Sequence, residues 1–253
     1  MTHPQQPSIR NVAVVIPAHN EEQRLGRALT GLRAALDTLG RKHPGVDASV
    51  TVVLDNCTDG SAAISAAFGA KDPRFHNVTV KLRSTGASRD HGVREALNRL
   101  QLQQAEQSEA TVWLANTDAD STVPGHWLVR QVDLANAGAD AVLGSVEPDP
   151  TDVDPVLLGR WLELHPFRED HSHIYGANLG IRASAYLTAG GFPLLRSHED
   201  RGLVERLRRQ GFTVTSTDTI RVVTSGRTHA RAPEGFGSYL RALGAELPAP
   251  ASG

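Results

Sequence analysis

The stretch VAVVIPAHNEE at residues 12–22 decides the fold class of this chain. It opens with a short β-branched run that ends at Pro17, which is typical of a buried strand. Asn20 then offers a side chain that can cap a helix, and Glu21 and Glu22 suit the positive end of that helix. The sequence therefore predicts a buried strand, a tight turn and a helix in immediate succession.

The same alternation continues through the first half of the chain. Leucines at spacings of three and four give the first helix one apolar face, and Gly40 and Pro44 end it. Further strands are expected at 50–54, 78–80, 111–114 and 141–146. Further helices are expected at 86–100 and 123–137, and a short Ala-rich helix is expected to begin at Asp59 or Ser61. Strands that alternate with amphipathic helices indicate an α/β fold with a mainly parallel, Rossmann-like sheet flanked by helices.

Beyond residue 150 the pattern becomes irregular. The expected elements there are a helix at 156–164, an extended segment at 174–181, a short helix capped by Ser184, a helix at 199–210 and strands at 212–215 and 220–223. No repeat or linker interrupts the chain. We therefore expect residues 1–10 to form a flexible tail and residues 11–253 to form a single domain.

Composition excludes several classes of protein. The 253 residues carry 26 Lys and Arg against 28 Asp and Glu, a net charge of -2, so the basic excess of a nucleic-acid-binding protein is missing. Cys57 is the single cysteine, which excludes an intrachain disulfide and a Cys-rich zinc site. The longest apolar run, 12–18, is far shorter than the roughly 20 residues that span a membrane. The N-terminus lacks a signal-peptide pattern, and these features together predict a cytoplasmic protein with no integral membrane segment.

Polar loops follow three of the expected strands, at residues 17–21, 54–61 and 116–121. The carboxyl ends of parallel strands lie at one edge of a sheet, where ligands of α/β proteins bind. Each loop alone also fits an ordinary capped turn, because Asp, Asn, Ser and Gly are turn formers. Three such loops at one edge favour a ligand site.

The triplet Asp118-Ala119-Asp120 in the last of these loops carries two carboxylates one residue apart. Mg²⁺ and Mn²⁺ prefer oxygen ligands and bridge to substrate phosphates, so the pair is suited to a metal-nucleotide complex. The first loop has no glycine fingerprint, which excludes an NAD-dependent dehydrogenase, and no Walker-type loop is present.

Six stretches together resemble family 2 glycosyltransferases, which have a GT-A fold. They are VVIPAHNEE at 14–22, VVLDNCTDGS at 52–61, TGASRDHGV at 85–93, NTDADS at 116–121, YGANLGIRASAYLTAGGF at 175–192 and HEDRGL at 198–203. The resemblance extends over residues 12–231. It implies a single-domain GT-A fold with a nucleotide-binding half at 11–120 and an irregular acceptor-binding half at 121–235. It also implies transfer of one sugar from a UDP- or GDP-sugar to a discrete hydroxyl acceptor, with Mn²⁺ or Mg²⁺ on the diphosphate.

The resemblance assigns expected roles residue by residue. The expected nucleotide-binding residues are Pro17, Ala18, His19, Glu21, Asp55, Arg89 and Asp118. The expected metal ligands are Asp120, Asp118 and His229. The donor sugar and acceptor are expected at Gly176, Ala177 and Asn178, and the diphosphate at Arg227 and Arg231. Asp200 is expected to be the general base of a reaction that inverts the sugar, with Glu199 beside it.

Some positions depart from the family pattern, and two alternatives stay open. Asn56-Cys57 replaces the more common Asp-Gly or Asp-Ser, and Asp90 stands where Asn is frequent. The Q-x-x-R-W motif of processive synthases is absent, which favours single sugar transfer. A sugar nucleotidyltransferase would need a Gly-rich loop after the first strand, and a non-catalytic relative would bind a nucleotide sugar without turnover. The sequence does not identify the sugar, the base, the acceptor or the oligomeric state, and it does not fix whether the anomeric centre is inverted or retained.

Overall fold

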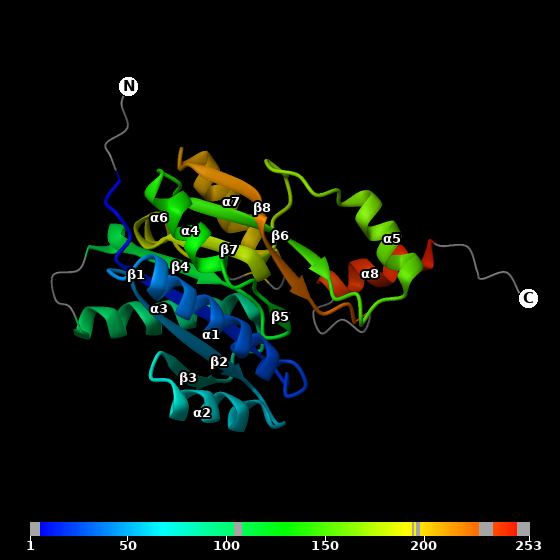
Figure 1. The fold of residues 1–253 in the computed structure, drawn as a ribbon, viewed down its shortest axis with the longest axis horizontal. Coiled ribbons are helices and arrows are strands. Elements are labelled where there is room, and N and C mark those ends of the chain that lie inside the picture. Colours follow the sequence, from blue (N-terminus) through cyan, green and yellow to red (C-terminus); the bar gives the residue numbers. More distant parts are fainter. Residues whose placement is uncertain (1–5, 104–107, 194, 196–197, 228–234, 247–253) are drawn as a thin grey trace, which may run out of the picture.

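A computed structural model describes residues 6–103, 108–193, 195, 198–227 and 235–246 as one α/β unit (Figure 1). Its elements in chain order are β1 Asn11–Ala18, α1 Leu25–Lys42, β2 Asp47–Asp55, α2 Ser61–Lys71, β3 Phe75–Val80, α3 Thr85–Gln103, η1 Glu109–Thr111, β4 Val112–Asn116, β5 Ser121–Thr122, α4 Trp127–Asn136, β6 Ala141–Pro148, α5 Pro155–Leu164, η2 Gly176–Asn178, β7 Leu179–Arg182, α6 Ala183–Thr188, α7 Glu199–Arg209, β8 Val214–Thr224 and α8 Phe236–Ala245.

The described strands form an eight-stranded sheet in the order β3-β2-β1-β4-β7-β6-β8-β5. Strands β1, β2, β3 and β4 are parallel to one another, and β6 is parallel to β8. The expected α/β fold with a mainly parallel sheet is confirmed. The sheet is nevertheless mixed, because β7 runs antiparallel to both β4 and β6, and β5 runs antiparallel to β8. All four residues of β7 are buried, so no alternation of polar and apolar residues marks this strand in the sequence.

Helices cover both faces of the sheet (Figure 1). On one face the core is formed with α1 and α4, and the expected leucine face of α1 is buried there. On the other face α3, α6 and α7 contribute the apolar side chains. A third, smaller cluster joins α5 to α8, beside the end of the sheet, with Trp161 and Leu240 at its centre. No helix in the described ranges combines the length and the apolar character needed to cross a membrane.

Two expected helix caps are wrong. Asn20 has a left-handed backbone with φ of 53°, and α1 begins only at Leu25 after Arg24, which makes no capping hydrogen bond. The Asn20 side chain instead accepts a 2.7 Å hydrogen bond from the backbone N–H of Thr58, so it joins two loops at the sheet edge. Ser184 lies inside α6, which begins one residue earlier and has no side-chain cap.

Other elements also differ from expectation. The two late strands are one long strand, β8, and α8 was not expected from the sequence. Ile9 is 3% exposed, and its backbone N–H donates a 2.8 Å hydrogen bond to Asn136 at the end of α4. The described part of the expected N-terminal tail is therefore packed on the domain, because an apolar side chain finds a place in the core there.

Candidate active site

The three polar loops meet at one edge of the sheet, as the sequence predicts. The parallel register of β1 with β2 and with β4 brings the carboxyl ends of these strands together. Direct contacts then join the loops, since Cys57 Sγ donates to the Ala18 carbonyl at 3.3 Å and the Glu21 N–H donates to Ser61 Oγ at 2.8 Å. His19 Nδ1 lies 2.6 Å from the Asp55 carbonyl oxygen. Pro17, at the end of β1, is partly buried in the same rim.

Asp55, the last residue of β2, organises the segment between β3 and α3. Its carboxylate accepts hydrogen bonds from the Leu82 N–H at 2.8 Å, the Ser84 N–H at 3.2 Å and the Ser88 hydroxyl at 3.0 Å. Burial by itself would raise the pKa of this carboxyl, but the hydrogen bonds from residues 82–88 outweigh it and hold the pKa below its usual value. The carboxylate that was expected to contact the nucleoside therefore also fixes the loop beside that position.

Arg89 on α3 connects the Asp118-Ala119-Asp120 triplet to the start of α7. Its Nη2 lies 2.5 Å from Asp118 Oδ1 and its Nη1 lies 2.5 Å from Glu199 Oε1, and its side chain is only 4% exposed. Burial would lower the pKa of Arg89, but the two carboxylates raise it well above its usual range, so the guanidinium stays charged. A Cβ atom on Gly176 would lie 2.2 Å from Arg89 Nη1, so only glycine leaves room for the guanidinium.

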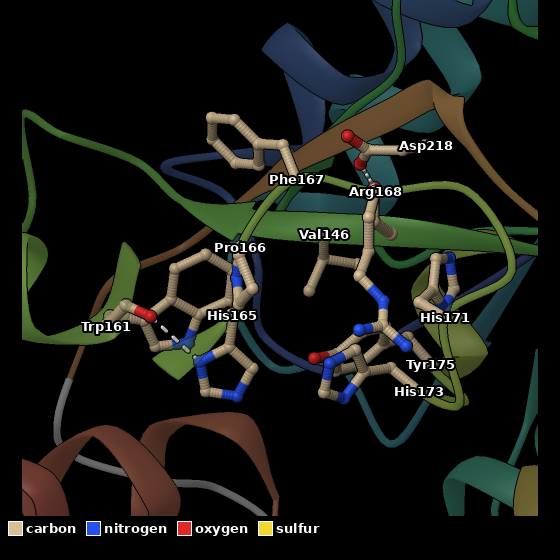
Figure 2. A pocket seen from close by; sticks show the side chains of 11 residues that line it. Val146, Trp161, His165, Pro166, Phe167, Arg168, His171, His173, Tyr175 and Asp218 are labelled. Atoms are coloured by element: carbon tan, nitrogen blue, oxygen red, sulfur yellow. Dashed lines mark hydrogen bonds between the residues drawn. The ribbon is translucent and has the colours of Figure 1, made fainter. Parts of the chain in front are cut away.

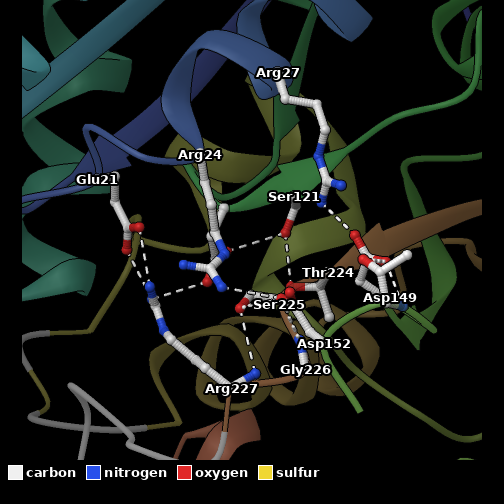
Figure 3. A network of polar contacts seen from close by, with 12 residues as sticks. Glu21, Arg24, Arg27, Ser121, Asp149, Asp152, Thr224, Ser225, Gly226 and Arg227 are labelled. Carbon is white, nitrogen blue, oxygen red and sulfur yellow. Dashed lines mark hydrogen bonds and ion pairs between the residues drawn. The ribbon is translucent and has the colours of Figure 1, made fainter.

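A second arginine, Arg227, pairs with the other carboxylate of the triplet. Its Nη2 lies 2.9 Å from Asp120 Oδ2, and both terminal nitrogens contact Glu21, at 2.7 and 3.0 Å (Figure 3). Burial and the negative charges of Asp118 and Glu21 raise the pKa of Asp120 to about 6, while Arg227 lowers it. The site therefore concentrates negative charge that requires a positive partner.

The segment that leads to Arg227 is held by side chains that the sequence analysis missed. Asp152 Oδ2 accepts hydrogen bonds from Ser225 Oγ at 3.1 Å and from the Gly226 N–H at 3.3 Å, and it forms a 3.1 Å ion pair with Arg24 (Figure 3). A second ion pair, of 2.5 Å, joins Arg27 to Asp149. The only signal in the sequence is that Pro148, Pro150 and Pro155 lie among acidic residues, which indicates a loop but not these contacts.

Asp200 lies at the start of α7, where its Oδ2 accepts a 2.7 Å hydrogen bond from the Gly176 N–H of η2. The structure thus brings together the two stretches that the sequence assigned to catalysis and to the donor sugar. Glu199, which is 7% exposed, has a pKa that burial raises and that Arg89 lowers, with a net upward shift. His198 before it adopts a left-handed backbone with φ of 61°, which turns the chain into the helix.

Asn178 serves the fold. Its amide Oδ1 accepts a 2.8 Å hydrogen bond from Trp127 Nε1, and its Nδ2 donates to the carbonyls of Ser145 and Ile220, each at 2.8 Å. The residue is 1% exposed, and Ala177 beside it is 8% exposed. The Asn178 side chain is therefore not placed where a sugar could contact it, although Gly176 remains at the site.

The expected metal ligands are only partly described. His229 and Arg231 lie outside the described residues. In the ranges that the structure describes, no three His, Cys, Asp or Glu side chains are grouped as a metal site. Asp118 and Asp120 are both present at the rim, with side chains 32% and 15% exposed. They could supply carboxylate oxygens to a divalent cation whose other ligands come from a bound diphosphate.

The comparison with protein families agrees with this geometry. The description Glycosyl transferase family 2 matches residues 13–189, which include the three loops, Arg89 and Gly176. The chain belongs to this family. No curated protein sequence matches the chain.

Solved structures with the same fold are distant in sequence. TarS residues 1–349 from S. aureus superpose with a TM-score of 0.61 at 14% identity, over 93% of this chain and 64% of that one. The mannosyltransferase PcManGT from Pyrobaculum calidifontis gives 0.61 at 19% identity, over 89% and 59%. Glucosyl-3-phosphoglycerate synthase from Mycobacterium tuberculosis gives 0.55 at 17% identity, over 86% and 72%. These structures show that the chain has a GT-A glycosyltransferase fold. The chain spans less than two thirds of the length of TarS 1–349 and of PcManGT.

Proposed function

We propose that this protein is a glycosyltransferase that moves one sugar from a nucleoside-diphosphate sugar to a hydroxyl acceptor, with Mn²⁺ or Mg²⁺ on the diphosphate. The observation that carries the proposal is the carboxylate pair of Asp118 and Asp120 at the rim, with Arg89 on one carboxylate and Arg227 on the other. The related folds point the same way, since PcManGT was solved with GDP-Man and Mn²⁺ and TarS with UDP.

The nucleoside would lie on the rim formed by β1, β2 and β4. The backbone at Pro17 and Ala18 and the ring of His19 would form one side, and Asp55 would lie across from them. Because Asp55 is fixed by the segment 82–88, the surface that meets the base is preorganised. UDP and GDP are both candidates for the nucleotide.

The residues present suit a divalent cation. Asp120 is buried among negative charges and holds a cationic side chain in the metal-free protein, which is the environment that a metal ion would satisfy. Asp120 would bind the ion directly, Asp118 would lie nearer the ribose, and His229 is proposed as a further ligand. When bound, the ion stabilises the negative charge of the leaving diphosphate. Arg227, with Arg231, would then be free to contact the diphosphate oxygens.

Asp200 is positioned to act as the general base. In the transfer step the acceptor oxygen forms a bond to the anomeric carbon while the bond from that carbon to the diphosphate oxygen breaks. The acceptor proton passes to Asp200, whose carboxylate is oriented by the Gly176 N–H. A direct displacement of this kind inverts the anomeric centre. Glu199 would orient Arg89, and through it Asp118, from its place beside the base.

Calorimetric titration with UDP and with GDP, each with and without Mn²⁺, tests the donor site. We expect one nucleotide to bind at least tenfold more tightly with Mn²⁺, and we expect Asp120→Asn to remove that gain. Asp37→Asn, at an exposed carboxylate on α1, is the matched control. Nucleotide binding that is equally tight without a metal would overturn the proposed site. Formation of a glycosylated product with the matched donor then distinguishes an enzyme from a non-catalytic relative.

A further inference from the structure

A small hollow that opens to solvent lies between β6, α5 and the segment 165–175 (Figure 2). Aromatic rings form much of its wall, since Trp161 stacks on His165 at 4.4 Å between ring centroids and His173 stacks on Tyr175 at 5.8 Å. His171 completes the wall beside His173. The described donor-site residues do not line this hollow.

The hollow is adjacent to the proposed reaction centre. Tyr175, one of its lining residues, directly precedes Gly176, whose N–H is hydrogen bonded to Asp200. Two consecutive residues, Tyr175 and Gly176, therefore connect the hollow to the carboxylate that is proposed to take the acceptor proton. The proposed donor rim reaches the same point from the other side, through Arg89 against Gly176.

The lining offers hydrogen-bond donors that have no acceptor. Trp161 Nε1 is a donor only, and it is buried without a hydrogen-bond partner on a side chain that is 1% exposed. Arg168, which is exposed, forms no ion pair among the described residues, and Figure 2 shows its guanidinium reaching over His173 and Tyr175. Such groups gain stability when an acceptor arrives.

The lining carries no free negative charge to balance these groups. Its single carboxylate, Asp218, is already paired with Arg221 and accepts a hydrogen bond from Ser145. Burial, together with the positive influence of His165, His171 and Arg168, holds the pKa of His173 below its usual value. Added positive charge is therefore disfavoured in the hollow, and the lining holds no free carboxylate with which the Arg168 guanidinium could pair.

We propose that this hollow binds an anionic group, a phosphate ester or a carboxylate, that the hydroxyl acceptor carries. Arg168 supplies the charge-assisted contact, and Trp161 supplies a buried N–H donor. The anion would anchor the acceptor so that its hydroxyl reaches Asp200. The role of this ligand as the acceptor rests on the proposed function, whereas the binding of the anion does not.

Three ligands with the same three-carbon skeleton test this proposal: glycerol, glycerol 3-phosphate and glycerate. Their affinities for the full chain are measured by calorimetry, alone and with saturating UDP and Mn²⁺. We expect at least one charged ligand to bind tenfold or more tightly than glycerol, and the better of the two identifies the anion. Arg168→Gln should lower that affinity about tenfold, and Trp161→Phe should weaken it several-fold. Arg160→Gln is the control, because Arg160 lies on α5 outside the lining of the hollow and pairs with Glu163, and this variant should leave the affinity for the anion unchanged.

Two results would overturn the proposal. The first is that neither charged ligand binds more tightly than glycerol under either condition. The second is that Arg168→Gln and Trp161→Phe bind the anion as well as the wild type, which would place it elsewhere on the chain. The metal-dependent binding of UDP and of GDP is measured separately. If the anion binds the hollow while neither nucleotide binds, the proposed function fails and the anion site remains.

Discussion

Nη2 of Arg227 lies 2.9 Å from Oδ2 of Asp120 and also 2.7 Å from Oε1 of Glu21. One cationic side chain therefore neutralises two carboxylates at the position where we propose a divalent metal. A metal ion bound to Asp120 would compete with Arg227 for the same carboxylate oxygens. The arginine is thus suited to balance the charge of these carboxylates and to contact the diphosphate when the proposed donor binds.

Arg227→Gln should change the affinities for metal and nucleotide in opposite directions. Mn²⁺ alone should bind several-fold more tightly, because its competitor for Asp120 is removed. UDP or GDP in the presence of Mn²⁺ should bind about tenfold more weakly, because a charged contact to the diphosphate is lost. Calorimetry of both ligands measures the two effects. Arg241→Gln, an exposed arginine on α8, serves as the control, and a variant in which both affinities fall would contradict this role.

The rim of the site could be predicted because parallel strands end at one edge and the side chains involved lie in the loops themselves. Asp55, Asp118 and Asp120 belong to this group. Neither the hydrophobic pattern nor the turn chemistry could show that Arg89 pairs with Asp118 and also with Glu199, which lies 110 residues away in the sequence. Pairings at such separations depend on the complete fold.

The sequence also did not show in which direction some side chains point. The family resemblance placed residues 176–178 at the donor sugar and acceptor, but β7 follows them at the centre of the sheet and the Asn178 amide lies in the core. The ion pair of Arg24 with Asp152 was hidden for a further reason. Arg24 lies in a turn where the pattern predicted helix, and its partner lies in a segment without periodicity.

Asn178→Ala tests whether this amide serves the fold or the sugar. The variant leaves the Trp127 indole N–H and the carbonyls of Ser145 and Ile220 without their partner inside the core. We expect the free energy of unfolding in urea to fall by about 2–4 kcal/mol. The difference in affinity between a nucleoside diphosphate and its sugar conjugate should not change. A selective loss of affinity for the conjugate, at unchanged stability, would restore the sugar contact.

Asp55 should make the free energy of unfolding depend on pH. Its folded-state pKa lies below the unfolded value of about 3.9, so its contribution is fully present above that value and is lost as the pH falls through the folded pKa. At pH 7, Asp55→Asn should cost about 1–3 kcal/mol, because an amide N–H₂ would face the N–H donors of residues 82–84. The gap in unfolding free energy between wild type and variant should narrow below about pH 4. Asp37→Asn is the control, and a gap that stays constant from pH 7 to pH 3 would contradict the linkage.

Asp200→Asn separates a catalytic base from a purely structural residue. In a purely structural role in the first turn of α7, Asn can still accept the hydrogen bond that the Arg201 N–H donates, so the unfolding free energy should change by less than about 1 kcal/mol in either case. As a base, Asn cannot accept the acceptor proton, and turnover should fall by about 10²–10⁴. The Gly176 N–H can still donate to the amide oxygen, and metal-dependent affinity for the nucleotide should stay within about twofold, since the donor is held at the rim. Glu205→Gln, at an exposed position in the same helix, should keep wild-type turnover. A near-normal rate for Asp200→Asn with a matched donor and acceptor would leave Asp200 with a structural role in the first turn of α7 and direct the search to its neighbour Glu199.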